Sequence, residues 1–341
     1  MGRQKDYLSI YLRRTSLESI EIPDSVIEIE RCAFAKCSKL RHVTLPKHLS
    51  RIAEGLFLQC SSLDGLVVPN GVQMIGLGAF GNCTTLEDIE IPNSVTNIGK
   101  LTFAECSSLR KVVIPNSVAK IGAGAFQGCA SLESIEIPDS IIDIERYAFA
   151  KCPKLRNITL SKHLSKIATG LFWQCSSLEG VVIPNSVKDI AGNAFCNVKS
   201  IKSFCVSESN QYFSSIDGIL YSKDMKTLKR VPEAKTLHSY KIPERVTKIG
   251  AYAFCGCTVE CVEIPSGVIE IGSRAFDFNQ INELHINIKD IMKCTIDDDA
   301  FGDEKIFNTC VLYVPSAAYS IYKRHPIFSK FRNYLAEDPP F

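Results

Sequence analysis

Three cysteines in the C-terminal third of the chain have a type and spacing that could bind a metal. Cys255 and Cys257 flank one glycine, and Cys261 follows four residues later. Thiolates at short spacing are typical ligands of structural zinc, which takes four ligands in all. A fourth ligand at a conventional spacing is missing from the sequence. We therefore predict neither a metal site nor a cofactor.

Motifs of familiar enzymes are missing from the sequence as well. The six histidines are scattered, and none pairs in sequence with a nucleophile. There is no glycine-rich phosphate-binding loop and no Gly-x-Ser-x-Gly elbow, which are the signatures of nucleotide-binding and of many hydrolytic enzymes. The sequence favours a protein without catalytic activity.

Most of the remaining thiols belong to a repeat. Seven of the fifteen cysteines recur every 23 residues, each three residues after a phenylalanine: Cys37, Cys60, Cys83, Cys106, Cys129, Cys152 and Cys175. Free cysteine is among the most buried residue types, and a disulfide between stacked equivalents would need a demanding geometry. We interpret this column as small buried side chains rather than as a disulfide framework.

Phenylalanine marks the register of the same repeat. It recurs at Phe34, Phe57, Phe80, Phe103, Phe126, Phe149, Phe172 and Phe195. Side chains that fill one irregular globular core have no reason to be equally spaced. A stack of coils, each burying its apolar face against its neighbours, produces this regularity. The sequence therefore predicts a solenoid with a 23-residue period.

Each repeat has an apolar pattern that predicts its local structure. Ile89 and Ile91 flank one exposed position, which indicates a short strand with one buried face. Pro92 lacks a backbone N–H and ends that strand. Val95 and Ile98 would pack the next side. The following Gly-x-x-Ala-Phe-x-x-Cys stretch is long enough for only a turn or two of α or 3₁₀ helix.

Composition narrows the range of partners. Lysine and arginine total 39 against 37 acidic residues, so no overall field points to nucleic acid or to an anionic membrane. No apolar run approaches the roughly 18 residues of a membrane span. Tyr11 lies one period before Phe34, so we expect the chain to open inside an incomplete coil.

The period is lost after Phe195. Asp217-Gly218 with strand-like flanks predicts a β-hairpin that projects from the coil. Val311–Pro315 is expected to be a last strand, and residues 317–334 a helix that closes the open end. The expected organisation is regular 23-residue repeats at 1–195 with the first coil incomplete, an irregular coil with a projecting hairpin at 196–242, resumed repeats at 243–302 and a strand–helix cap at 303–341.

The motif L-x-x-I-x-I-P-x-S-V-x-x-I-G-x-x-A-F-x-x-C resembles the BspA-like (Treponema-type) leucine-rich repeat family over about residues 8 to 302. The resemblance implies an α/β solenoid: a right-handed superhelix of about 12 coils with a parallel β-sheet on one face and short helical turns. It also implies a non-catalytic protein-binding module, with many members at the bacterial cell surface or secreted as adhesins. A host extracellular matrix protein or a protein of a neighbouring cell is then the expected partner. An intracellular scaffold protein without export is the alternative.

Two sets of residues are candidates for partner contact. The first is the exposed column of the strand, between its two inward residues: Glu21, Thr44, Val67, Glu90, Val113, Glu136, Thr159 and Val182. These could equally be generic solvated strand residues, because aromatic anchors are missing. The second set is Tyr212, Phe213 and Tyr221 in the hairpin, expected to be exposed among basic residues; the alternative is a structural spacer.

The column beside the first set carries charges that alternate in sign at all but one step. It consists of Glu18, Arg41, Asp64, Glu87, Arg110, Glu133, Arg156 and Glu179. Strands about 4.8 Å apart would place neighbouring charges next to each other. We therefore expect a ladder of surface ion pairs that supports register and solubility rather than ligand binding.

Overall fold

The chain forms two compact units, Met1–Val198 and Lys199–Phe341, in a computed structural model that describes residues 7–8, 16–302 and 304–337. We call these unit 1 and unit 2. Both are built from short parallel strands stacked coil upon coil, with about 14 turns in the whole chain and little helix. The predicted leucine-rich-repeat solenoid is confirmed, with slightly more turns than the 12 expected. Tyr11 and the start of the first coil lie outside the described residues.

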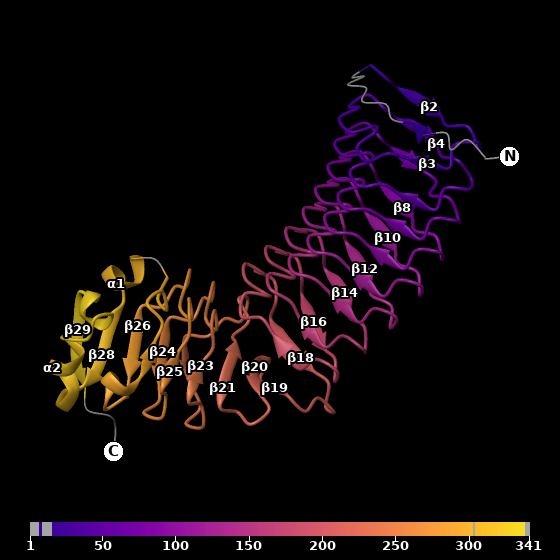
Figure 1. Cartoon of the computed structure of the whole chain (residues 1–341). Coiled ribbons are helices and arrows are strands. Elements are labelled where there is room, and N and C mark those ends of the chain that lie inside the picture. The colour runs from indigo at the N-terminus through magenta and orange to yellow at the C-terminus, as the bar shows by residue number, and fades with distance from the viewer. Residues whose placement is uncertain (1–6, 9–15, 303, 338–341) are drawn as a thin grey trace. The chain divides into compact units, whose positions relative to one another are not determined.

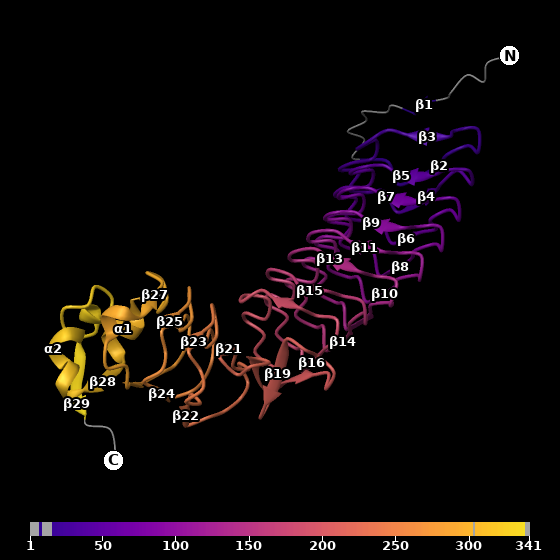
Figure 2. The same cartoon turned by 60° about the horizontal axis from the view of Figure 1, so that its bottom comes forward.

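Unit 1 contains two series of strands that run along the stack. The first series is seen in Figure 1, where all of its strands except β6 are labelled: β2 (Ser19–Glu21), β4 (His42–Thr44), β6 (Gly65–Leu66), β8 (Asp88–Glu90), β10 (Lys111–Val113), β12 (Ser134–Glu136), β14 (Asn157–Thr159) and β16 (Gly180–Ile183). The second series is clearest in Figure 2: β1 (Tyr7–Leu8), β3 (Glu28–Ile29), β5 (Arg51–Ile52), β7 (Met74–Ile75), β9 (Asn97–Ile98), β11 (Lys120–Ile121), β13 (Asp143–Ile144), β15 (Lys166–Ile167) and β17 (Asp189–Ile190).

The sequence predicted only the first series. Its strands hydrogen-bond in small groups, β2 with β4 and β6, β8 with β10, and β12 with β14. The second series forms a continuous sheet from β5 to β13. Equivalent residues pair directly, as Ile98 does with Ile75 and with Ile121. A two-residue strand is too short to show alternation in sequence, which is why this second ladder was missed.

The phenylalanine column forms the centre of unit 1. Successive rings from Phe34 to Phe195 stack nearly parallel, with centroids 5.4 to 6.2 Å apart, and every ring is buried. The cysteine column lies beside it. Cys106 Sγ donates to the carbonyl oxygen of Phe80 in the preceding coil at 3.1 Å, and the same contact recurs from Cys60 to Cys175. All fifteen cysteines are free thiols.

The expected helical turn is instead a run of tight turns. The N–H groups of Ala79, Gly81 and Cys83 donate to carbonyls three residues earlier in their own coil. The N–H groups in between, including that of Phe80, donate to the next coil. Every fourth residue in this stretch has a left-handed backbone, as Gly78 and Asn82 do with φ of 59°. A helix needs negative φ throughout, so this side forms a third hydrogen-bonded ladder.

Unit 2 has the same kind of coils with less regular lengths. One sheet of six strands consists of β19 (Phe213–Ile216), β20 (Ile219–Ser222), β21 (Thr227–Arg230), β23 (Lys248–Ile249), β25 (Glu270–Ile271) and β27 (Thr295–Ile296). A second sheet of five parallel strands consists of β22 (Ser239–Lys241), β24 (Cys261–Ile264), β26 (Glu283–Ile286), β28 (Val311–Pro315) and β29 (Asn333–Glu337). The unit opens with β18 (Ser203–Val206).

The predicted hairpin is present, but it does not project. β19 and β20 are antiparallel across Asp217-Gly218, whose φ angles of 51° and 76° suit a tight hairpin turn. β20 pairs with β21, and β21 pairs parallel with β23 of the next coil. The hairpin is therefore part of the coil ladder. Its inward side chains, Ile219 among them, belong to the core of unit 2.

The C-terminal cap differs from the single helix expected over 317–334. This region contains the 3₁₀ helix η2 (Ser316–Ala318), the short α2 (Tyr319–Tyr322), the 3₁₀ helix η3 (Phe328–Lys330) and then β29. Phe328 and Phe331 pack edge-on against Phe301, the last ring of the column in unit 2. Pro326 interrupts helix formation. β28 is consequently not the last strand, because β29 pairs with it in parallel.

Two short helices complete the description, η1 (Ile291–Lys293) and α1 (Lys305–Thr309). Within the described ranges no helix has the length and apolar character that crossing a membrane would require.

Candidate functional site

All eight residues of the predicted strand column are exposed. They lie on the first series of strands, where the residues on either side of each, such as Val112 and Ile114 beside Val113, point into the core. The valines of the column are large apolar groups left in solvent, with Val67 83% and Val113 60% exposed. Exposed apolar side chains grouped on one face are a common property of interaction surfaces.

The structure brings four of the eight together at one hollow. A depression of about 780 Å³ is lined by residues of β4, β6 and β8, including Thr44, Val67 and Glu90. An adjoining depression of about 630 Å³ shares Asn70, Asp88, Ile89, Glu90 and Pro92 with it and extends to Lys111 and Val113. We call the two together the β4–β10 groove. Glu21, Glu136, Thr159 and Val182 do not line it.

The larger depression of the groove lies beside a strand residue that has no side chain, Gly65. Gly65 occupies the position that His42 and Asp88 fill one coil before and one coil after. A Cβ at Gly65 would meet no atom within 4 Å, so the space above it is open. A glycine in an exposed strand position weakens the strand, and β6 has only two residues. Gly65 is visible in the sequence, but the open space beside it is not.

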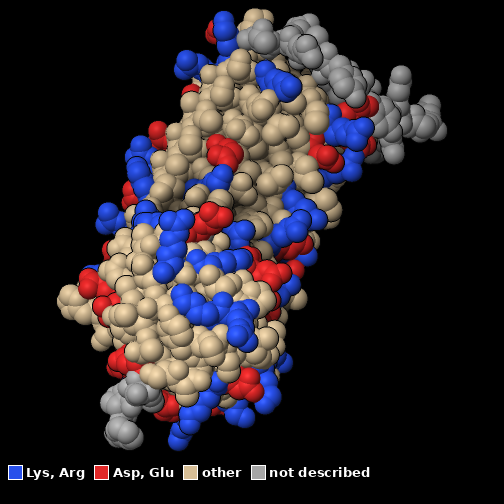
Figure 3. All heavy atoms as spheres, turned by 90° about the vertical axis from the view of Figure 1, so that its left-hand side faces the viewer, with Lys and Arg blue, Asp and Glu red and all other residues tan. Residues whose placement is uncertain are grey.

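The groove combines apolar and charged groups of both signs. His42 Nδ1 lies 3.5 Å from Asp64 Oδ1, and Asp88, Glu90 and Lys111 lie further along. Figure 3 shows the same mixture more widely, because on the face it draws acidic and basic side chains are interspersed. A mixed surface of this kind selects partners by local complementarity rather than by a long-range field.

The predicted ladder of ion pairs along the first series is wrong for most of its length. Within the described part of the chain, Arg110 Nη2 and Glu87 Oε1 at 3.9 Å are the one pair of that column at ion-pair distance. The first series is interrupted by gaps between its small sheets, and both side chains of this pair are mostly exposed. Solvation therefore competes with pairing at these positions.

Ion pairs instead join neighbouring coils on the second series. Lys120 Nζ lies 3.1 Å from Asp143 Oδ2 and 2.7 Å from Glu145 Oε1, and Lys166 Nζ lies 3.4 Å from Asp143 Oδ1. Hydrogen bonds to Glu145 and then Asp143 raise the pKa of Lys120. Burial alone would raise the pKa of Asp143, but hydrogen bonds and charge from Lys120 and Lys166 lower it overall.

Two of the three hairpin candidates are not available for contact. Phe213 and Tyr221 are buried, whereas Tyr212 is 43% exposed. Tyr221 packs in the core of unit 2 and its hydroxyl hydrogen-bonds that of Tyr240. The expectation that all three face solvent is wrong because the hairpin joins the sheet, which turns its alternate side chains inward. Arg230, one of the basic residues near the hairpin, is buried as well.

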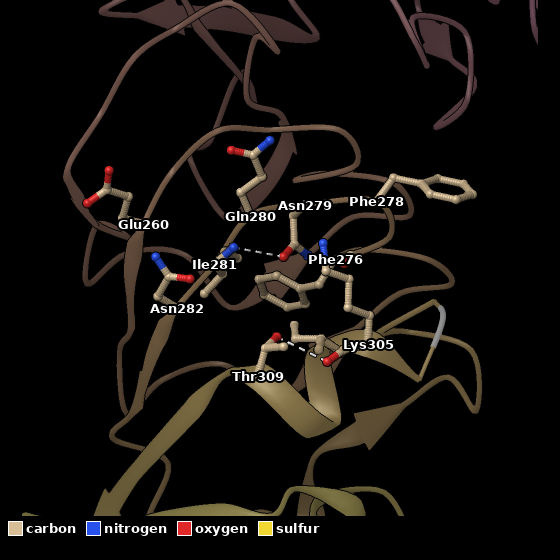
Figure 4. A pocket seen from close by; sticks show the side chains of 10 residues that line it. Glu260, Phe276, Phe278, Asn279, Gln280, Ile281, Asn282, Lys305 and Thr309 are labelled. Carbon is tan, nitrogen blue, oxygen red and sulfur yellow. Dashed lines mark hydrogen bonds between the residues drawn. The ribbon is translucent and has the colours of Figure 1, made fainter.

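Unit 2 has a hollow of its own at a different place. About 440 Å³ lies between the amide side chains of Asn279, Gln280 and Asn282 and the first turn of α1 at Lys305. Figure 4 shows the ring of Phe278 turned away from these amides, on the outside of its loop, where it is largely exposed. This hollow was not predicted from the sequence, because much of its lining comes from an irregular loop.

Comparison of the sequence with known protein families agrees with this architecture. Residues 9–129, 96–217 and 233–323 match the family described as BspA type leucine rich repeat region, in six copies. These matches cover most of the chain, and the protein belongs to this family. A comparison with curated proteins finds no match.

Two solved structures are similar in fold. A leucine-rich repeat protein from Eubacterium ventriosum is 23% identical with a TM-score of 0.57, over 74% of this chain and 61% of that one. A leucine-rich repeat protein from Bacteroides ovatus is 23% identical with a TM-score of 0.56, over 87% of this chain and 83% of that one. The chain thus spans less than two thirds of the length of the Eubacterium protein.

Proposed function

We propose that the protein is a non-catalytic protein-binding repeat module and that the β4–β10 groove is its contact surface. One observation supports this most directly: four residues of the exposed strand column surround one continuous hollow with two solvent-facing valines. Burying a valine on binding stabilises a complex by about 1.5 to 3 kcal/mol. The groove thus offers apolar contact within a rim of charges, which is the usual anatomy of a protein interface.

The proposed partner is an extracellular matrix protein, and the proposed location is the cell surface or the secreted fraction. Both come from the family resemblance, in which surface adhesins are common, rather than from any contact in the structure. Surface labelling of intact cells of the native organism tests the location. Labelling that appears only after lysis would favour the intracellular scaffold instead.

The binding experiment uses the full chain against a panel of purified extracellular matrix proteins on a biosensor. We expect saturable binding to at least one, weakened tenfold or more by Val67→Glu or Val113→Glu, since tenfold corresponds to about 1.4 kcal/mol. Ile142→Glu is the matched control, because Ile142 is 59% exposed in unit 1 but lies beside the second series of strands. A panel without saturable binding, or equal losses in all three variants, would contradict the proposal.

A further inference from the structure

Three metal-ligating side chains from neighbouring strands meet on the outward face of the five-stranded sheet in unit 2. Cys261 begins β24, and Glu283 and His285 lie two residues apart on β26. One ligand atom of each lies within 4.8 Å of the other two. The strands are parallel and in register, with Cys261 opposite Glu283. We propose that these residues form a zinc-binding site, which we call the Cys261 site.

The orientation of His285 supports this assignment. Its Nδ1 lies 2.8 Å from Glu337 Oε2 on β29, so with the proton on Nδ1 this nitrogen donates to the carboxylate. Nε2 then carries the free lone pair. Metal-ligating histidines nearly always have such a carboxylate or carbonyl behind the ring, because it fixes the tautomer and raises basicity. The ring also stacks on Tyr313, with centroids 4.1 Å apart and planes 1° apart.

The separations are close to those a tetrahedral ion requires. Zinc binds nitrogen and oxygen at about 2.0 to 2.2 Å and sulfur at about 2.3 Å, which sets ligand atoms roughly 3.5 Å apart around a tetrahedron. Nε2 of His285 lies 3.7 Å from Glu283 Oε2. The thiol of Cys261 lies within 4.8 Å of a ring nitrogen of His285 and of a carboxylate oxygen of Glu283, so the three ligands surround one small space.

The charges of the cluster favour a dication. Glu283 and Glu337 are both carboxylates, and within the described residues His285 is the one basic side chain at ion-pair distance from either. Lys241, which lines the hollow beside the cluster, is already engaged, since its Nζ lies 2.9 Å from Glu263 Oε1. A free lone pair of Nε2 facing a carboxylate oxygen is unfavourable without a positive charge between them. A zinc ion supplies that charge, and its binding releases the thiol proton to solvent.

The fourth coordination position would face open space. A hollow of about 290 Å³ lies against the cluster, lined by Cys261, His285, Glu337 and Lys241 among others. Three protein ligands with one open position describe a zinc site that is accessible from solvent. This differs from the short-spaced thiolates that the sequence suggested, because Cys255 and Cys257 are buried in the core. Glu283 and His285 follow Cys261 by one coil instead.

Cobalt(II) titration of the reduced full chain tests the Cys261 site, because Co²⁺ substitutes for zinc and reports its ligands by absorption. We expect one equivalent to bind, with visible bands and a near-ultraviolet thiolate-to-cobalt charge-transfer band, and zinc to displace it. Cys261→Ser should abolish the charge-transfer band. Cys205→Ser is the matched control, since Cys205 is an exposed thiol in the same unit, and it should leave the spectrum unchanged.

Glu337→Gln separates metal binding from a purely structural role of the cluster. It keeps the shape of the side chain and should weaken zinc affinity by 10- to 100-fold, as for other residues behind a ligating histidine, with an unchanged circular dichroism spectrum. Absence of cobalt and zinc binding to the folded chain, or a charge-transfer band that persists in folded Cys261→Ser, would overturn the proposal. His285 would then have only a structural role, through its contacts with Glu283 and Glu337.

Discussion

Unit 1 and unit 2 each contain a column of stacked rings, but they differ in the regularity of their coils. In unit 1 the phenylalanines are 23 residues apart, so each position of one coil has its equivalent in the next coil 23 residues later. In unit 2 the steps from Phe254 to Phe276 and from Phe276 to Phe301 are 22 and 25 residues, yet the rings stack at 5.0 and 5.2 Å. The core therefore tolerates unequal coils, provided that the ring returns to its place.

The difference lies in which side chains meet between coils. Stacked copies in unit 1 produce ladders and one long surface, interrupted where Gly65 opens the groove. Unequal coils in unit 2 bring unlike residues together, as at the Cys261 site. Unit 2 also contains a buried ion pair within a single segment, in which Arg230 Nη2 lies 2.5 Å from Glu233 Oε1. Coils of equal length thus favour extended surfaces built from equivalent positions. Coils of unequal length favour compact clusters of unlike polar side chains.

The largest expected effect is at the middle of the regular stack. Phe126→Ala removes a ring that is stacked on both sides, and we expect a loss of about 3 to 5 kcal/mol in the free energy of unfolding. Urea denaturation followed by Trp173 fluorescence measures it, because the single tryptophan lies in unit 1.

Phe276→Ala is the counterpart in unit 2, and it sharpens the comparison of the two units. Its stability loss should appear in far-ultraviolet circular dichroism and shift the Trp173 transition less than Phe126→Ala does, since coils interact mainly with their neighbours. Equal shifts of the tryptophan transition in both variants would show that the two units unfold as one.

The buried ion pair of unit 2 should be nearly as sensitive. Glu233→Ala leaves the Arg230 guanidinium, which also donates to the carbonyls of Tyr252 and Cys255, without its carboxylate. We expect a loss of about 3 to 5 kcal/mol in denaturant unfolding. The double variant Arg230→Met with Glu233→Leu should recover most of it, because no charge then remains buried. A double variant no more stable than the single would contradict this account.

A smaller effect is expected at the cysteine column. Cys106→Ala removes the Sγ–H donated to the Phe80 carbonyl and should lower the free energy of unfolding by about 1 kcal/mol. Burial raises the pKa of the Cys106 thiol to about 12, so the column should be inert. In a thiol-reagent titration of the native chain, exposed Cys32 and Cys205 should react first. Rapid reaction of the whole set of thiols before denaturation would argue against stacked coils.

The smallest effect is expected from the ion pairs of the second series. Lys120→Met should lower the free energy of unfolding by at most about 1 kcal/mol, because the side chain is largely solvated. The folded pKa of Lys120 is raised, so its contribution is complete below about pH 10.4 and is lost as pH rises through the folded value. The pKa of Asp143 is lowered, so its contribution is present above about pH 3.9 and is lost as pH falls. Thermal melts across pH should show the variant and the parent converging at both extremes.

The sequence predicted the parts of the fold that depend on periodicity. The ring column, the first strand series and the Asp217-Gly218 hairpin follow from spacing and turn chemistry alone. The tight turns were missed because apolar spacing suits a helical turn as well, and the positive φ of residues such as Asn82 is not visible in it. The direction in which the hairpin packs was also missed, since Tyr221 suits a core as well as a surface.

The candidate sites could be predicted only in part. The alternation of inward and outward residues predicted the exposed strand column. The groove was not predicted, because part of it is the open space beside Gly65, which has no side chain. The spacing of Cys261 to Cys257 suggested a metal ligand, although the side chains that Cys261 meets in the structure lie one coil later. Contacts between coils of unequal length depend on the register of strands such as β24 and β26, and the sequence gives no simple period for them.

The constant spacing of the rings determines which insertions and deletions the fold can accept. Recombination that inserts or deletes one whole coil of unit 1 leaves each remaining ring with a partner identical to the one it had before. Gaining or losing a single residue within a coil displaces a ring from its stack unless the loops absorb the shift, as they do between Phe276 and Phe301. Descendants of this chain should therefore vary more readily in the number of coils than in the contents of any one.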